Sequence, residues 1–343
     1  MAVGRKLSTV RNILSHAAAL MTFACAAAAA VGQFGRISEA CDFANQFAPL
    51  WMACGVAAAI VASILGSWPL RGASVIAGTL IVGLGLVQTG PDVFARATTQ
   101  WRVGAAERPL KIVSFNVWKS NQDPSATAAW ILREDPDVII LADAAGKGQL
   151  VADDLHARYP YGVRCARWNC STLLLSKQPS VRAGGLAHGD PENRQGLSAA
   201  WATFVDSEGE FTVIAVHMPR PWPYGTQATQ QRLLIDDVAQ MDRRRMIVAG
   251  DFNATPWSFA LQRMDRGLGL PRRTRAVFTW PARLPHGMQA ISPILPIDQV
   301  YASDAWSTVS VARGPMLGSD HYPLVFQLAP NSTTAAAPTT SQR

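Results

Sequence analysis

Hydrophobic residues are distributed unevenly along this chain, and the division falls near residue 100. Residues 1–100 contain nine Asp, Glu, Lys and Arg residues, whereas residues 101–343 contain 46. Because a helix needs about 20 apolar residues to cross a bilayer, an uncharged span of that length can supply one. Three such spans cover residues 12–35, 43–70 and 72–91. We therefore predict a membrane anchor over residues 1–91, built as a bundle of three transmembrane helices near 13–33, 48–67 and 72–89.

The first span is open to a second interpretation. Arg5, Lys6 and Arg11 form a basic start, and the small residues of 26–30 offer a cleavage site, a combination that is typical of a signal peptide. The two later spans favour the membrane bundle, because three uncharged spans in succession are unusual for buried soluble helices.

Basic residues predict the orientation of the bundle, since Lys and Arg gather in cytoplasmic loops. Arg5, Lys6 and Arg11 precede the first helix, and Arg71 lies in the short loop before the third. The N-terminus is therefore placed in the cytoplasm. Three crossings then put residues 101–343 on the periplasmic or outer side of the inner (cytoplasmic) membrane. The expected partner is the lipid bilayer, through residues 13–89, and no protein partner is predicted.

Short apolar runs alternate with polar segments from Leu110 onward. The runs are typical of buried strands, and they lie at 110–115, 138–141, 171–176, 197–205, 211–217, 246–249, 296–302 and 323–328. The pattern at 226–242 predicts a long helix. Helical segments separate only some of these strands, and this pattern indicates mixed sheets covered by helices. We expect a linker at 92–108, an α/β domain at 109–328 and a disordered tail at 329–343.

Charge and cysteine content narrow the possibilities further. Residues 101–343 hold 25 basic against 21 acidic residues, an excess too small for a dedicated binder of duplex nucleic acid. Cys165 and Cys170 lie close together, and a short-loop disulfide would fit an oxidising compartment. Two free thiols are the alternative. A metal site at these cysteines is disfavoured, because partner ligands are missing nearby.

Polar side chains recur where the predicted strands end or begin, which predicts that they converge on one rim of a sheet. They are Asn116, Asp143, His217, Asp251, Asn253, Asp298, Asp320 and His321. Phosphodiesters resist hydrolysis because their negative oxygens repel a nucleophile, so a catalyst needs a cation, a base and a donor to the leaving oxygen. Carboxylates, amides and histidines supply these functions, and Mg²⁺ prefers oxygen ligands. The pattern indicates a divalent-metal phosphoester hydrolase.

The ordered motifs resemble the endonuclease/exonuclease/phosphatase superfamily. They are Ser114-Phe115-Asn116-Val117-Trp118, His217, Gly250-Asp251-Phe252-Asn253, Ile297-Asp298 and Ser319-Asp320-His321. That group includes pancreatic-deoxyribonuclease-like enzymes, abasic-site endonucleases, inositol-polyphosphate phosphatases and sphingomyelinases. Over residues 108–328 the resemblance implies a four-layer α/β/β/α sandwich with two mixed sheets. It also implies Mg²⁺, or Mn²⁺, as cofactor and a phosphate ester as substrate, such as nucleic acid or a phospholipid headgroup.

The resemblance implies that Asn116, Asp143 and Asp320 hold the metal. The family normally has glutamate, within a Leu-Gln-Glu segment, where this sequence reads Leu141-Ala142-Asp143. Aspartate can still ligate Mg²⁺, although its side chain is one methylene shorter. The alternative that follows from this departure is a catalytically weakened binding or scaffold module on the same fold.

The remaining five residues would carry the reaction. By resemblance, Asp251 would position the attacking water, and Asn253 would bind a phosphate oxygen. Asp298 would orient His321, which would act as the base or polarise the phosphate. His217 would contact the phosphate or protonate the leaving oxygen.

Overall fold

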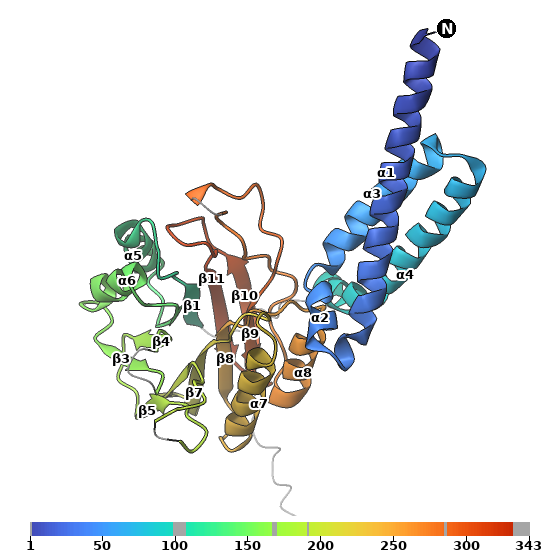
Figure 1. Ribbon diagram of the computed structural model, residues 1–343. Helices are drawn as coiled ribbons and strands as arrows, with labels where there is room; N and C mark the ends of the chain where they lie inside the picture. The colour runs from blue at the N-terminus through green and yellow to red at the C-terminus, as the bar shows by residue number, and fades with distance from the viewer. Residues whose placement is uncertain (1, 99–107, 167–169, 191, 285–286, 332–343) are drawn as a thin grey trace, which may run out of the picture.

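An elongated N-terminal helical bundle is attached to one side of an α/β domain in the computed structural model of this protein (Figure 1). The structure describes residues 2–98, 108–166, 170–190, 192–284 and 287–331. The bundle comprises α1 (Ala2–Gly32), the 3-10 helix η1 (Gln33–Arg36), α2 (Glu39–Asn45), α3 (Ala48–Leu65) and α4 (Trp68–Thr98).

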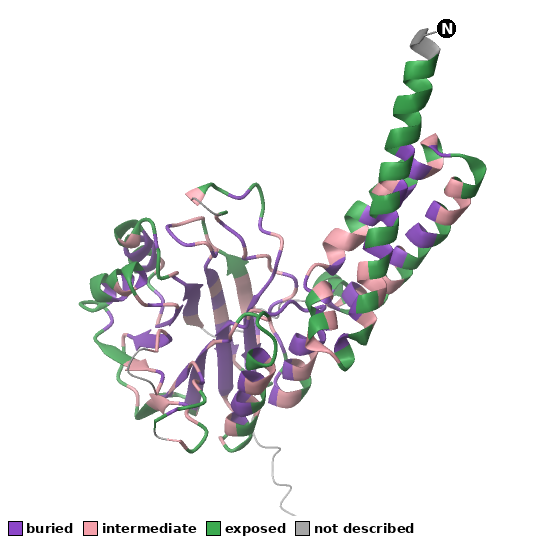
Figure 2. Cartoon of the chain, in the orientation of Figure 1, coloured by how far each residue is buried: buried purple, intermediate pink, exposed green. Residues whose placement is uncertain are grey.

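Three of these helices, α1, α3 and α4, are long and apolar enough to cross a membrane by length and composition. Cys25 and Ala26 of α1 pack against Ala77 and Ile81 of α4, and small residues of this kind allow membrane helices to approach closely. Many residues of the bundle are exposed (Figure 2), and they include large apolar residues such as Ile64, which is 66% exposed. A surface with this much exposed apolar area fits contact with lipid.

Two mixed sheets form the centre of the α/β domain. The first has the strand order β10-β11-β1-β2-β4-β3, and the second has the order β5-β6-β7-β8-β9. In the first sheet the strands are β1 (Leu110–Asn116), β2 (Val138–Ala142), β3 (Tyr161–Arg164), β4 (Leu173–Ser176), β10 (Trp306–Arg313) and β11 (Leu324–Pro330). In the second they are β5 (Arg182–Gly185), β6 (Ala199–Asp206), β7 (Gly209–His217), β8 (Met246–Asp251) and β9 (Asp298–Ala302). Each sheet contains one parallel pair, β1 with β2 and β7 with β8.

Helices cover the outer faces of both sheets (Figure 1). They are α5 (Pro124–Glu134) and α6 (Lys147–Leu155) on the first sheet, and α7 (Thr226–Ala239) and α8 (Phe259–Leu268) on the second. Ile112 and Ile140 join the core between the sheets, whereas Val113 and Ile139 join the core beneath α5 and α6. This alternation is the two-residue period of a strand with both faces buried. The predicted four-layer sandwich is confirmed.

Helix α4 continues to Thr98, past Pro91 and into the segment expected to be a linker. The extension is stabilised by the α/β domain, because Asp92 forms a buried ion pair with Arg272 at 2.8 Å. Arg96 also donates to the carbonyl oxygen of Arg275 at 2.8 Å. Residues 92–98 of the predicted linker are therefore helical, and 99–107 lie outside the described residues. Strand β11 likewise continues to Pro330, whereas residues 332–343 of the predicted tail lie outside the described part.

Helix α2 packs against the N-terminus of α8 and joins the bundle to the domain. The carboxylate of Asp42 accepts hydrogen bonds from the backbone N–H groups of Phe259 and Ala260, each at 2.8 Å. Gln46 accepts from the backbone N–H of Thr255 at 2.9 Å. The first N–H groups of a helix lack partners within the helix, so Asp42 completes the cap of α8. Buried polar contacts, in addition to the chain itself, therefore hold the helical bundle on the α/β domain.

Cys165 and Cys170 are joined by a disulfide, with their Cα atoms 5.8 Å apart. This outcome decides between the two alternatives that the cysteine spacing left open. The bridge lies beside β4, where Cys170 Sγ is 3.3 Å from the hydroxyl oxygen of Ser198.

Candidate active site

The candidate site lies where strands of both sheets end side by side. Asn116 is the last residue of β1, His217 the last of β7, and Asp251 the last of β8. In the register of the second sheet, Asp251 pairs with His217 on one side and with Asp298 of β9 on the other. Three neighbouring strands therefore present ionisable side chains at one edge, and β1 adds an amide from the opposite sheet.

Gly250 allows β8 to approach β7 closely enough to place Asp251. Its φ is +148°, and a Cβ atom there would lie 1.9 Å from the carbonyl oxygen of Val216. Because real Cβ atoms do not come so close to backbone, only glycine fits this position. Strand packing thus requires Gly250, and Gly250 in turn places Asp251 in the site.

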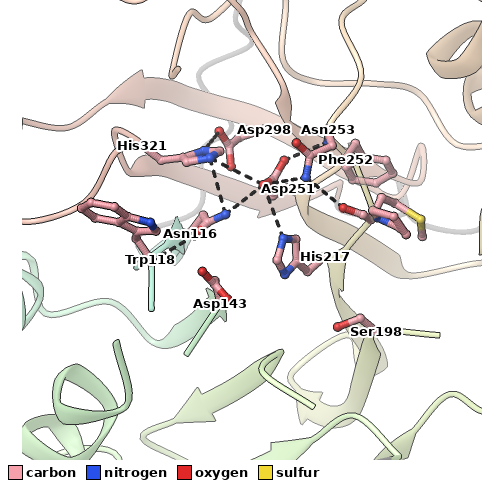
Figure 3. Close-up of polar contacts among 12 residues, drawn as sticks. Asn116, Trp118, Asp143, Ser198, His217, Asp251, Phe252, Asn253, Asp298 and His321 are labelled. Atoms are coloured by element: carbon pink, nitrogen blue, oxygen red, sulfur yellow. Dashed lines mark hydrogen bonds and ion pairs between the residues drawn. The ribbon is translucent and has the colours of Figure 1, made fainter. Parts of the chain in front are cut away.

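His321 lies at the centre of the site, between two carboxylates (Figure 3). Its Nδ1 atom is 2.9 Å from Oδ2 of Asp298, and its Nε2 atom is 3.7 Å from Oδ2 of Asp251. The loop that carries it is fixed by Ser319, whose hydroxyl accepts from the His321 N–H at 3.0 Å and donates to the Asn116 carbonyl at 2.6 Å. All these side chains are buried.

The two carboxylates determine the charge of the imidazole. Burial alone would lower the pKa of His321, but Asp298 and then Asp251 outweigh it and raise the pKa to about 9. Burial raises the pKa of the Asp251 carboxyl, and the nearby Asp298 adds to that increase. His321 is therefore an imidazolium at neutral pH that can donate from Nε2, beside a carboxylate of increased basicity.

Asp251 is held by a set of donors. The side-chain amide of Asn116 donates to its Oδ2 at 2.9 Å, and the backbone N–H of Asn253 donates to its Oδ1 at 2.8 Å. The Asn253 amide donates to Met218 O at 2.9 Å and to Asp251 Oδ2 at 3.2 Å. The group expected to bind phosphate thus has both amide hydrogens engaged, and it fixes Asp251. Nε2 of His217 lies 3.8 Å from Asp251 Oδ2.

Asp143 and Asp320 supply further oxygen atoms. Asp143 follows β2, its Oδ2 accepts from the Lys119 N–H at 2.9 Å, and its side chain points toward Asn116 (Figure 3). Asp320 receives a 3.4 Å contact from the indole N–H of Trp280 on Oδ2. Its Oδ1 is buried without a hydrogen-bond partner among the described residues. An unmatched buried carboxylate oxygen needs a donor or a cation.

The residues present fit a divalent cation. Asn116, Asp143 and Asp320 offer amide and carboxylate oxygens, which are the ligands that Mg²⁺ takes. Asp251, Asp298 and His321 also bring ligand atoms within 4.8 Å of one another and could hold an ion. In that group, however, Nδ1 of His321 already faces Asp298 at hydrogen-bond distance. The oxygen set is thus the better match for a hard cation.

Comparison with known proteins agrees with this geometry. Residues 113–321 match the model of the Endonuclease/Exonuclease/phosphatase family. The chain belongs to this family. No curated protein sequence matches the chain.

Solved structures share the fold of this family member. An endonuclease/exonuclease/phosphatase from Bacteroides vulgatus is 17% identical with a TM-score of 0.51, covering 66% of this chain and 100% of that chain. The human Nocturnin catalytic domain with bound sulfate anion is 15% identical with a TM-score of 0.51, and the match covers 68% of this chain and 100% of that chain. A functionally unknown conserved protein from Enterococcus faecalis is 16% identical with a TM-score of 0.51, and the match covers 64% of this chain and 100% of that chain.

A cavity of about 660 Å³ opens over the family motifs. Seven of the eight predicted residues line it, and the eighth, Asp298, lies behind His321. Sequence reasoning missed several other lining residues, namely Phe43, Gln46, Phe47 and Lys119. Phe43 and Phe47 lie at the start of the second apolar span, at a helical spacing of four residues, which was the one signal available for them.

Proposed function

We propose that this protein is a membrane-anchored, divalent-metal-dependent phosphoesterase that hydrolyses a phosphodiester or phosphomonoester. Members of its family are generally metal-dependent hydrolases. The observation that carries the proposal is the convergence of Asp251, Asp298 and His321, buried and facing one another beside Asn116. An accumulation of buried titratable groups at the floor of a cavity is typical of a catalytic site.

Asn116, Asp143 and Asp320 would hold Mg²⁺, or Mn²⁺. When bound, the ion would offset the negative charge of the phosphate oxygens and of the leaving oxygen. The buried Oδ1 of Asp320, which has no hydrogen-bond partner in the described part of the chain, supports this assignment. Asp143 lines the cavity, and the Lys119 N–H fixes one of its carboxylate oxygens.

Asp251 would accept the proton of the attacking water. Burial raises the pKa of Asp251, and a carboxylate with a raised pKa is a stronger general base. Asn253 and Asn116 keep its two oxygens in place through the hydrogen bonds described above. Both asparagines therefore serve as positioning residues for Asp251.

His321 would donate a hydrogen bond to a phosphate oxygen. The Asp298 carboxylate, at 2.9 Å from Nδ1, holds the ring as an imidazolium with Nε2 on the side of Asp251. A positive donor placed in advance stabilises the charge that develops on the phosphate. His217, on the other side of Asp251, would protonate the leaving oxygen.

Hydrolysis of bis(p-nitrophenyl) phosphate by the full chain in maltoside micelles tests this function. We expect Asp251→Asn and His321→Ala each to lower kcat by about 10²–10⁴-fold, the usual contribution of a general acid or base. The matched control is Asp154→Asn, an exposed carboxylate of α6 outside the cavity, which should keep wild-type activity. Wild-type activity in both site variants would contradict the assigned site, and no hydrolysis by the wild type itself would support the scaffold alternative.

We also propose that the catalytic domain lies outside the cytoplasm, on the periplasmic side of the inner membrane. The basic residues Arg5, Lys6 and Arg11 before α1 and Arg71 before the third span support this orientation. The Cys165–Cys170 disulfide fits an oxidising compartment. Alkaline phosphatase fused after Arg343 should be active, because it folds only outside the cytoplasm. Activity of a cytoplasmic reporter at the same position would overturn the orientation.

A further inference from the structure

The membrane anchor forms part of the wall of the active-site cavity. Phe43 of α2 and Phe47, directly before α3, line the same cavity as Asp251 and His321. Phe43 is 36% exposed although it is aromatic. The cavity is therefore lined both by the helical bundle and by the α/β domain. Without the anchor, this side of the cavity would be open.

The aromatic wall is held rigidly in place. Asp42 caps α8 and Gln46 bonds Thr255, so the residues on either side of Phe43 are fixed to the domain. The rings of Phe43 and Phe47 pack edge to face with centroids 5.6 Å apart. Trp51, one turn further along α3, continues the row at 6.0 Å from Phe47. This row runs from the cavity directly into a membrane-spanning helix.

The length of α3 places the cavity at the level of the bilayer surface. Its 18 residues span about 27 Å at about 1.5 Å per residue, close to the hydrocarbon thickness of about 30 Å. Phe47 immediately precedes this span, where aromatic side chains collect at membrane interfaces. Phe34 and Ile37 lie at the same end of the bundle and are 60% and 85% exposed. Such exposure is costly in water and favourable against lipid.

The loop that carries Trp222 adds another aromatic side chain to the cavity wall. Trp222 lines the cavity and is 64% exposed, and it packs edge to face with Tyr224. The next residue, Gly225, donates its N–H to the Glu39 carboxylate of α2 at 2.8 Å, which brings this loop against the anchor. Arg220, also exposed, adds a positive charge at the cavity. Aromatic rings with a basic side chain suit the headgroup region of a membrane.

We propose that the substrate is an amphiphilic phosphate ester that remains in the bilayer during the reaction. Its phosphate reaches Asp251 and His321, while its alkyl chains lie against Phe43 and Phe47. Water attacks phosphorus, one ester P–O bond breaks, and the leaving oxygen takes a proton. A diester thus yields an alcohol and a phosphate monoester. The inference rests on the proposed phosphoesterase function, to which it adds the class of substrate.

Two probes with the same scissile bond test the inference: methyl p-nitrophenyl phosphate, which is soluble, and hexadecyl p-nitrophenyl phosphate, which enters micelles. The full chain is assayed with both in dodecyl maltoside, a phosphate-free detergent. We expect kcat/KM to be higher for the hexadecyl probe. Phe43→Ser should lower the hexadecyl-to-methyl ratio by about tenfold, the scale of losing part of one buried aromatic contact. Phe43→Leu should keep the ratio, because the wall stays apolar.

Phe94→Ala is the matched control, because Phe94 is an exposed aromatic residue of α4, 70% exposed and outside the cavity. The hexadecyl-to-methyl ratio of this variant should equal that of the wild type. An effect of the cavity wall is thereby distinguished from an effect of attachment to the micelle. An unchanged ratio in Phe43→Ser, or a preference of the wild type for the methyl probe, would overturn the inference while leaving the phosphoesterase function intact. Cleavage of neither probe would instead contradict the function itself.

Discussion

The Nδ1 atom of His321 lies 2.9 Å from Oδ2 of Asp298, and both side chains are buried. The two residues are separated by 23 positions and by the loop that leads to β11. A buried histidine paired with a carboxylate is fixed in orientation and protonation state. This pair therefore leaves Nε2 as the ring nitrogen on the side of Asp251.

Replacing Asp298 by Asn should remove the charge that keeps His321 protonated. The ring would lose its preferred orientation, so we expect kcat on a phosphodiester to fall by about 10²-fold or more. The pKa of His321, followed by NMR, should fall at the same time. Asp237→Asn breaks a comparable pair at the surface, in which His188 Nδ1 lies 3.1 Å from Asp237. That control should change neither quantity, and an unchanged kcat in Asp298→Asn would show that the pair is merely structural.

The raised pKa of His321 predicts a stability that depends on pH in the chelator-treated protein. Its folded-state value of about 9 lies above the usual 6.5, so protonation favours the folded state. The stabilisation is complete below pH 6.5 and is lost as the pH rises through about 9. We expect the Tm of the full chain to fall over this window more than that of His321→Gln. Parallel pH profiles of the two proteins would contradict the assignment.

Asp42 should contribute to the attachment of the anchor. Asp42→Ala would leave the Phe259 and Ala260 N–H groups without their acceptor, and the loss of a helix cap costs about 1–2 kcal/mol. Hydrogen–deuterium exchange should increase at the start of α8 and in α2 together. Asp123→Ala, which removes the cap of α5 at Ala126, should lower stability without affecting α2. Unchanged exchange in α2 of Asp42→Ala would show that the cap does not hold the anchor.

The architecture of the domain could be predicted because strand patterns are local. Apolar runs such as 138–141 and 246–249 marked β2 and β8, and the polar residues that follow them marked the site. The short edge strands β3 and β5, and also β10, were missed. Strand β3 is half-exposed, and β10 mixes Ser and Thr with apolar residues, so neither has a strong pattern. Pairing with their neighbours, not composition, defines them.

The contribution of the N-terminal helical bundle to the site could not be predicted. Helix α2 has only seven residues, and it is stabilised by Asp42 contacting residues 217 and 218 positions away. Nothing in the local sequence near Asp42 indicates such a partner. The same holds for the extension of α4, because the ion pair of Asp92 is with Arg272. Contacts with distant segments therefore stabilise α2 and the last turns of α4 as helices.

The most direct test of the account is the rate of phosphodiester hydrolysis by the chelator-treated full chain as Mg²⁺ is added back. We predict no hydrolysis without the ion and a saturable recovery with it. Asp143→Ala should need at least about tenfold more Mg²⁺ for half-maximal rate, because loss of a charged ligand weakens binding of a hard cation. Hydrolysis that persists unchanged in the chelator, or that never appears at any Mg²⁺ or Mn²⁺ concentration, would contradict the metal-dependent phosphoesterase.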